Sequence, residues 1–305
     1  MATWIWLTSL LSLANCVFLV ISGRNTPSKW SYGLSMGVHA AGALVSLLGL
    51  LSVIQIHGDE EIYLFSLFGL PIHEGFEINY GTTIALLVLY LCAFEYALIG
   101  WRRAEAIHPD VAFRSTFQLS WWTFGFSFLV MSPTLLQAFI GSAICFVGAI
   151  WLVLRTTDVA ALGRRGALAG MAVIGFLLQT LPTWIAWHAL HTVQLTQLSQ
   201  LGPGQGPWHG PAWTVWLWFV GVLLEVAAAE MFCIWHAHRE QARGVQRRLT
   251  IGLGLVSGIY IWRSWSVVVA SPWMVIIIAL AGVIVLASVG LTVMTVRSKQ
   301  LNSAQ

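Results

Sequence analysis

The chain has 305 residues, of which 58% are hydrophobic and only 9% are charged, and its formal net charge is +3. Soluble domains carry about 25% charged residues. The composition, with a mean hydropathy of +0.78, therefore predicts an integral membrane protein. It excludes a soluble globular enzyme, a disordered chain and a secreted disulfide scaffold.

Apolar stretches long enough to cross a membrane follow one another along the whole chain. A spanning helix needs about 20 mostly apolar residues, and nine stretches meet this length: 4–23, 33–56, 79–100, 113–132, 134–154, 168–190, 211–235, 249–270 and 273–296. The first charge, Arg24, follows the first stretch, whereas a secretory signal has its positive charge in front. We therefore expect residues 4–22 to be a retained first helix.

The basic residues predict how these helices are oriented. Fourteen of the fifteen Lys and Arg residues fall in alternate connections, and the opposite connections hold acidic residues such as Glu74 and Glu77. Because basic loops stay on the cytoplasmic side, we predict a multi-pass plasma (inner) membrane protein with its N-terminus outside and its C-terminus cytoplasmic.

An internal repeat organises the prediction further. Helices two to five align with helices six to nine, so that Glu95 matches Glu230 and Ser132-Pro133 matches Ser271-Pro272. The predicted fold is therefore all-α, with an N-terminal helix (1–30) and two tandem four-helix bundles (31–157 and 158–305). Each unit has an even number of helices, so a pseudo-two-fold axis along the membrane normal relates the bundles. The alternative is a chance alignment of apolar helices.

Histidines at the outer helix ends form the first candidate site. The repeat pairs His57 with His191, and His73 with His209. Histidine is the commonest metal ligand, so these four residues could converge on haem or on a copper, zinc or iron ion. Alternatively, they are interfacial residues that hydrogen-bond to headgroups, water or loop carboxylates.

Ionisable residues inside the predicted helices form the second candidate site. Such residues usually face an interior or a pathway, and three carboxylates qualify: Glu95, Glu225 and Glu230. His39 lies at the depth of Glu95 and is expected to pair with it. The group could relay protons, or it could form structural hydrogen bonds between helices.

Arg263 is the one basic residue predicted to lie away from the cytoplasmic side. A central Arg costs about 2.5–3.5 kcal/mol on insertion scales, so a counter-charge is expected, with Glu225 the nearest candidate. Arg263 could instead hold an anionic group such as a haem propionate, a quinone oxygen or a substrate carboxylate, or extend to the outer surface.

Tryptophans gather near the outer end of the seventh helix. Trp208, next to His209, could line a binding site for a flat aromatic ligand. Trp121 and Trp122 are placed at the start of the fourth helix. Since Trp is common at membrane interfaces, most of these residues are expected to be anchors.

The two-bundle architecture is similar to that of haem A synthases and of the quinol-oxidising membrane anchors of molybdenum oxidoreductases. No functional residue can be transferred from these families, because the E-x-x-x-H-R motif of haem A synthases is absent from this sequence. The WWD signature of cytochrome c assembly proteins is absent too, since Thr123 follows Trp121-Trp122.

Three functions agree with these patterns. The first is a haem- or metal-linked membrane redox protein or subunit, the second a proton-coupled transporter, and the third an intramembrane enzyme acting on a lipophilic substrate by acid–base chemistry. An assembly subunit without a site of its own is the fourth possibility. The expected partners are the lipid bilayer, other membrane subunits or a quinone, and not nucleic acid.

Overall fold

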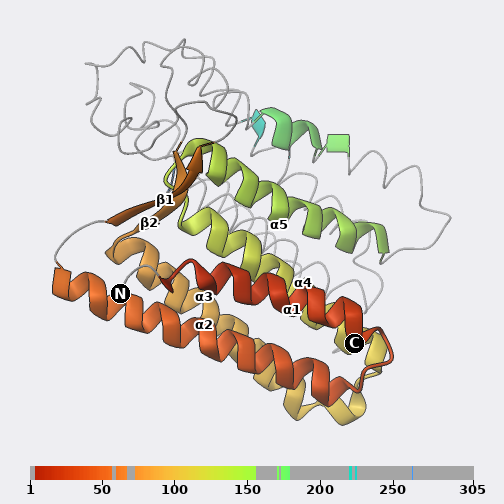
Figure 1. Cartoon of the computed structure of the whole chain (residues 1–305). Helices are drawn as coiled ribbons and strands as arrows, with labels where there is room; N and C mark the ends of the chain where they lie inside the picture. The colour runs from red at the N-terminus through yellow and green to blue at the C-terminus, as the bar shows by residue number, and fades with distance from the viewer. Residues whose placement is uncertain are drawn as a thin grey trace, which may run out of the picture.

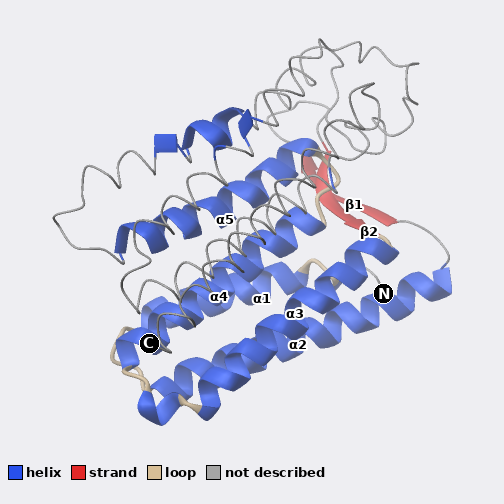
Figure 2. Ribbon diagram, turned by 180° about the vertical axis from the view of Figure 1, so that it is seen from behind, coloured by secondary structure: helices blue, strands red, loops and turns tan. Residues whose placement is uncertain are grey.

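The computed structural model describes residues 4–56, 60–66 and 73–155, together with 170–171, 173–178, 220–221, 224 and 263. In this part of the chain there are five α-helices, a short 3-10 helix and one β-hairpin (Figures 1 and 2). The elements in order are α1 (Leu7–Ser22), α2 (Ser28–Ile56), β1 (Glu60–Ser66), β2 (His73–Ile78), α3 (Tyr80–Arg102), η3 (Ala104–Ala106), α4 (Pro109–Val130) and α5 (Leu135–Arg155).

The first five predicted spans are confirmed as helices, and local chemistry explains where they begin and end. Gly23 ends α1 with a φ of 79°, a left-handed conformation that suits glycine. His108 caps α4 and Pro109 occupies its first turn, so this helix begins before the apolar run at 113. In the Ser132-Pro133 turn, the Thr134 hydroxyl accepts a hydrogen bond from the Gln137 N–H at 3.0 Å. Thr134 therefore caps α5.

The five helices run alongside one another in a single packed group (Figures 1 and 2). α2 packs along α3, α5 packs along α4, and α1 contacts both α2 and α4. The N-terminal helix thus belongs to the same bundle as the helices of the first predicted repeat. The second repeat (158–305) and the pseudo-two-fold axis fall almost wholly outside the described residues and stay predictions.

The bundle has two chemically different ends. The α1–α2 and α3–α4 connections, with Arg24, Lys29, Arg102 and Arg103, lie at one end, and the hairpin with Glu77 lies at the other. Among the described helices, 28–54 and 80–102 are long and apolar enough to cross a membrane, each with a mean hydropathy of 2.0. The topology and its direction across the membrane stay predictions.

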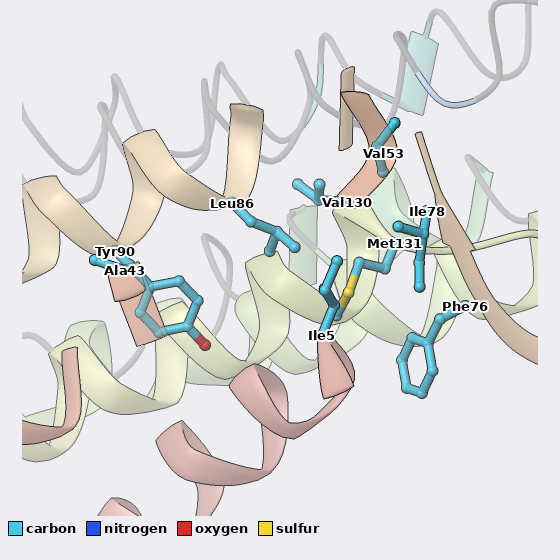
Figure 3. Packing of buried hydrophobic residues seen from close by; sticks show 9 residues of the cluster. All are labelled: Ile5, Ala43, Val53, Phe76, Ile78, Leu86, Tyr90, Val130 and Met131. Atoms are coloured by element: carbon cyan, nitrogen blue, oxygen red, sulfur yellow. The ribbon is translucent and has the colours of Figure 1, made fainter. Parts of the chain in front are cut away.

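The acidic outer connection was expected to be a loop, and most of it is an antiparallel hairpin instead. β1 pairs with β2 in a register that sets Glu61 opposite Glu77, and the Glu77 N–H donates to the Met131 carbonyl at 2.8 Å. Phe76 and Ile78 of β2 are buried against the end of the bundle, beside Met131 (Figure 3). The hairpin therefore covers one end of the apolar core.

Glycines allow α4 and α5 to approach closely. A Cβ on Gly141 would lie 2.7 Å from the backbone N of Leu129, and one on Gly148 would lie 2.7 Å from Trp121 and Trp122. The Trp121 indole also donates to the Ile144 carbonyl at 2.8 Å. Placing these tryptophans at the start of the fourth helix was wrong: they lie midway along α4 and pack against α5.

The close approach predicts a specific sensitivity to a single methyl group. We expect Gly141→Ala to destabilise the protein by about 1–3 kcal/mol, because the contact is with backbone that cannot rotate away. The matched control is Gly37→Ala, on an exposed face of α2 where a Cβ meets nothing within 4 Å. Thermal unfolding in detergent measures both variants, and equal midpoints would contradict the packing described for α4 and α5.

Candidate functional site

A cluster of polar side chains crosses the middle of the bundle. It consists of Ser12 and Asn15 of α1, Ser35 and His39 of α2, Tyr90 of α3 and Ser120 of α4, and we call it the polar cluster. All six side chains are buried. Because hydrocarbon offers no hydrogen-bond partners, polar groups at this depth depend on one another.

Asn15 connects three of the four helices. Its amide nitrogen donates to the Ser35 hydroxyl at 3.0 Å and to the Ser120 hydroxyl at 2.6 Å. These two bonds use both amide hydrogens of the side chain. The amide oxygen Oδ1 of Asn15 is buried and has no hydrogen-bond partner in the described part of the chain. Asn15 therefore presents an open acceptor inside the bundle.

His39 is fully buried, and its surroundings define its tautomer. Nδ1 lies 2.5 Å from the carbonyl oxygen of Ser35. A carbonyl only accepts hydrogen bonds, so Nδ1 must carry the proton and Nε2 must carry a lone pair. Nε2 is also buried and has no partner among the described residues. Nε2 is therefore a second open acceptor.

Tyr90 brings α3 into the same cluster. Its hydroxyl donates to the Thr8 carbonyl at 2.6 Å, so it must accept the 3.1 Å hydrogen bond from Ser12. The ring lies 6.1 Å from the His39 ring, measured between centroids, and beside Ala43 (Figure 3). Gly42 faces the Tyr90 ring so closely that a side chain there would overlap it. A small residue on α2 is thus required for the ring to enter the bundle.

The open acceptors suggest what kind of group would complete the cluster. A buried polar atom without a partner costs about 1–3 kcal/mol, and ordered water is its usual partner inside proteins. Asn15 Oδ1 and His39 Nε2 both accept, and both side chains contact Ser35. A water molecule, which can donate two hydrogen bonds, therefore has the chemistry to complete the cluster.

Glu95 lies away from the polar cluster. It is exposed on α3, whereas His39 is fully buried and contacts Ser35 and Tyr90. The expected His39–Glu95 pair is therefore wrong. The sequence placed the two residues at similar depth along their helices but could not show that they face different directions.

Arg263 has its counter-charge in the hairpin. Its guanidinium donates to Oε2 of Glu77 and to the carbonyl oxygen of Ser132, and both side chains of the ion pair are largely buried. The expected partner, Glu225, lies outside the described residues, and the partner found is Glu77. The sequence assigned Glu77 to a loop, which hid its role inside the protein.

Glu77 joins three parts of the structure through separate atoms. Oε1 accepts from the Asn79 amide at 2.6 Å, and Asn79 caps α3 by accepting from the Thr82 N–H at 2.8 Å. Oε2 accepts from Arg263, and the backbone N–H donates to Met131 at the end of α4. The Ser132 carbonyl lies just beyond the same helix end, where the helix dipole favours a cation. The ion pair thus ties residue 263 to the start of α3 and the end of α4.

The predicted metal site is mostly outside the described residues. His57, His191 and His209 fall there, as do the proton-relay candidate Glu230 and the ligand-wall candidate Trp208, and only the position of His73 in β2 is described. Within the part of the chain that the structure describes, no group of three or more His, Cys, Asp or Glu residues could hold a metal ion. The histidine site and the Trp208 ligand wall stay predictions.

Comparison with known proteins supports the membrane class. No protein-family model matches the chain, and no curated protein matches it either. Among solved structures, the chain is similar to one chain of the membrane-bound sulfane sulfur reductase, an archaeal respiratory membrane complex, with a TM-score of 0.59 and 12% identity. The match covers 88% of this chain and 53% of the other, so this chain spans about half the length of its structural relative. The likeness is one of fold: an all-α membrane protein.

The Glu77–Arg263 pair predicts a large loss of stability when it is broken. Glu77→Gln removes a carboxylate that pairs with the buried guanidinium, and breaking a buried ion pair typically lowers the free energy of unfolding by about 3–5 kcal/mol. The matched control is Glu105→Gln. Glu105 pairs with Lys29 at 2.6 Å between side chains that are 82% and 56% exposed, and such an exposed pair adds little to stability. Denaturant unfolding in detergent measures both variants, and equal losses would contradict the structural role of Glu77.

Proposed function

We propose that the chain is a membrane subunit of a respiratory redox complex and that its polar cluster conducts protons through the first bundle. The observation that carries the proposal is His39. It is a fully buried histidine with a lone pair on Nε2, held within a hydrogen-bonded network at the middle of the helices. The fold likeness to a chain of a respiratory membrane complex supports the setting.

The chemistry follows from the tautomer. Nε2 takes a proton from a water molecule, the imidazolium keeps its Nδ1–H on the Ser35 carbonyl, and Nε2 then returns the proton to a second water molecule. The Ser35 hydroxyl accepts from Asn15, and the Tyr90 hydroxyl accepts from Ser12 and donates to the Thr8 carbonyl, so hydroxyl groups of α1, α2 and α3 lie in the same cluster as His39. Such a network moves charge through a membrane interior where an isolated ion would be costly.

The structure also bears on the role of Arg263. The guanidinium already contacts Glu77 and the Ser132 carbonyl, so binding a haem propionate or a quinone oxygen is not needed to explain its burial. The outer histidines remain a separate prediction of a haem or metal site, which this proposal does not use.

Membership of a complex is tested by purifying the tagged chain from its native membrane in a mild detergent. The proposal predicts defined additional subunits in fixed stoichiometry, at least one of which carries a redox centre visible in the absorption or paramagnetic resonance spectrum. A chain that purifies alone, or with subunits that lack any redox centre, would contradict it.

Proton conduction is tested by replacing the histidine. In vesicles that contain the whole complex, we expect His39→Leu to reduce proton transport driven by electron transfer by about a hundredfold, the low end of what a positioned acid–base group contributes. The matched control is Ser46→Ala on the same helix, because Ser46 is equally buried but only donates to the Gly42 carbonyl at 2.8 Å. Unchanged transport in His39→Leu, or equal losses in both variants, would contradict the proposal.

A further inference from the structure

One face of α3 is exposed along the whole helix. The exposed residues recur every three or four positions, so they form a single stripe on the helix surface. We call it the α3 stripe, and it consists of Tyr80, Ile84, Val88, Leu91, Cys92, Glu95 and Ile99. All of these side chains except Glu95 suit a lipid environment.

Glu95 is out of place on such a surface. It lies seven residues before the end of α3 at Arg102, which corresponds to about 10 Å along the helix. It makes no hydrogen bond or ion pair with any residue that the structure describes. Ionisable residues within membrane spans almost always pair with one another or face an interior, and a glutamate side chain is too short to reach the helix end.

The neighbouring helix α2 provides an internal comparison. Its exposed face between residues 37 and 54 consists of Gly37, Ala40, Leu44, Leu47, Leu48, Leu51 and Ile54, without an ionisable residue. This is the composition expected of a face that contacts lipid. The two exposed faces are similar in apolar character and differ in one carboxylate, so lipid explains the α2 face and leaves Glu95 unexplained.

We propose that the α3 stripe is the docking surface for a transmembrane helix of another subunit, which carries a Lys or Arg at the depth of Glu95. Charge complementarity within an otherwise apolar stripe identifies this partner. A second copy of the chain fits poorly, because fourteen of its fifteen basic residues lie in predicted connections and Arg263 contacts Glu77. The inference rests on the proposed membership of a complex and is independent of proton conduction.

Site-specific photo-crosslinking in native membranes tests the docking surface. A benzophenone amino acid replaces Leu91, one helical turn from Glu95, and in a parallel sample it replaces Leu48 on the exposed face of α2. We expect the Leu91 position to give a discrete protein adduct, identified by mass spectrometry as a transmembrane segment with a Lys or Arg, and the Leu48 position to give lipid adducts only.

The carboxylate is then tested in the same background. We expect Glu95→Gln to reduce the Leu91 adduct about tenfold, while Glu105→Gln, which changes an exposed carboxylate of η3 outside the α3 stripe, leaves it unchanged. Exchanging the charges, with Glu95→Lys combined with Glu at the partner's basic position, should restore the adduct. Restoration shows a direct pair and separates it from a general effect on folding.

Four results would overturn the docking proposal: lipid adducts only at Leu91, an adduct with a second copy of the chain, a partner segment without a cation, or an adduct indifferent to Glu95→Gln. If the other subunits still purify with the chain, any of these results removes the docking surface and leaves the proposed function intact. If no other subunit purifies with it, the proposed function fails as well.

Discussion

Inside a bilayer, every polar group must find its partner within the protein, because hydrocarbon supplies none. This constraint explains the arrangement of the first bundle. Asn15 lies among Ser35 and Ser120, and Tyr90 lies among Ser12 and Thr8, so the helices are held together by hydrogen bonds as well as by packing. Asn15 Oδ1 and His39 Nε2 have no hydrogen-bond partner among the described residues. Ordered water is the usual partner of such buried acceptors.

At the hairpin end of the bundle, charged groups rather than hydroxyls provide the partners. Arg263 is buried because Glu77 and the end of α4 neutralise it. Glu77 can do so because the hairpin carries it over the core, and Asn79 couples its position to the start of α3. The hairpin is therefore a structural part of the bundle rather than a loop outside it. Glu95, by contrast, is exposed on α3, where the described chain offers it no partner.

The sequence predicted the first five helices because a spanning helix is a long apolar run, and such runs can be located without knowing the fold. It also singled out His39, Glu95 and Arg263, since ionisable residues are rare in this chain and stand out in apolar runs. The sequence did not predict the interaction partners of His39 and Arg263 correctly. Depth along a helix follows from counting residues, but the direction of a side chain depends on how the helices pack. His39 was therefore assigned to Glu95, and Arg263 to Glu225. The hairpin was missed because the strands are short and the acidic residues suggested an exposed loop.

Proton conduction through the bundle requires that His39 has a protonated Nδ1 and a hydrated Nε2 that carries a lone pair. Solid-state NMR of the protein in lipid bilayers, with magnetisation transferred from water to the labelled ring nitrogens, tests this claim most directly. The account predicts a hydrogen on Nδ1, a bare Nε2, and rapid transfer from water to Nε2. A hydrogen on Nε2, or a ring that receives no magnetisation from water, would contradict it.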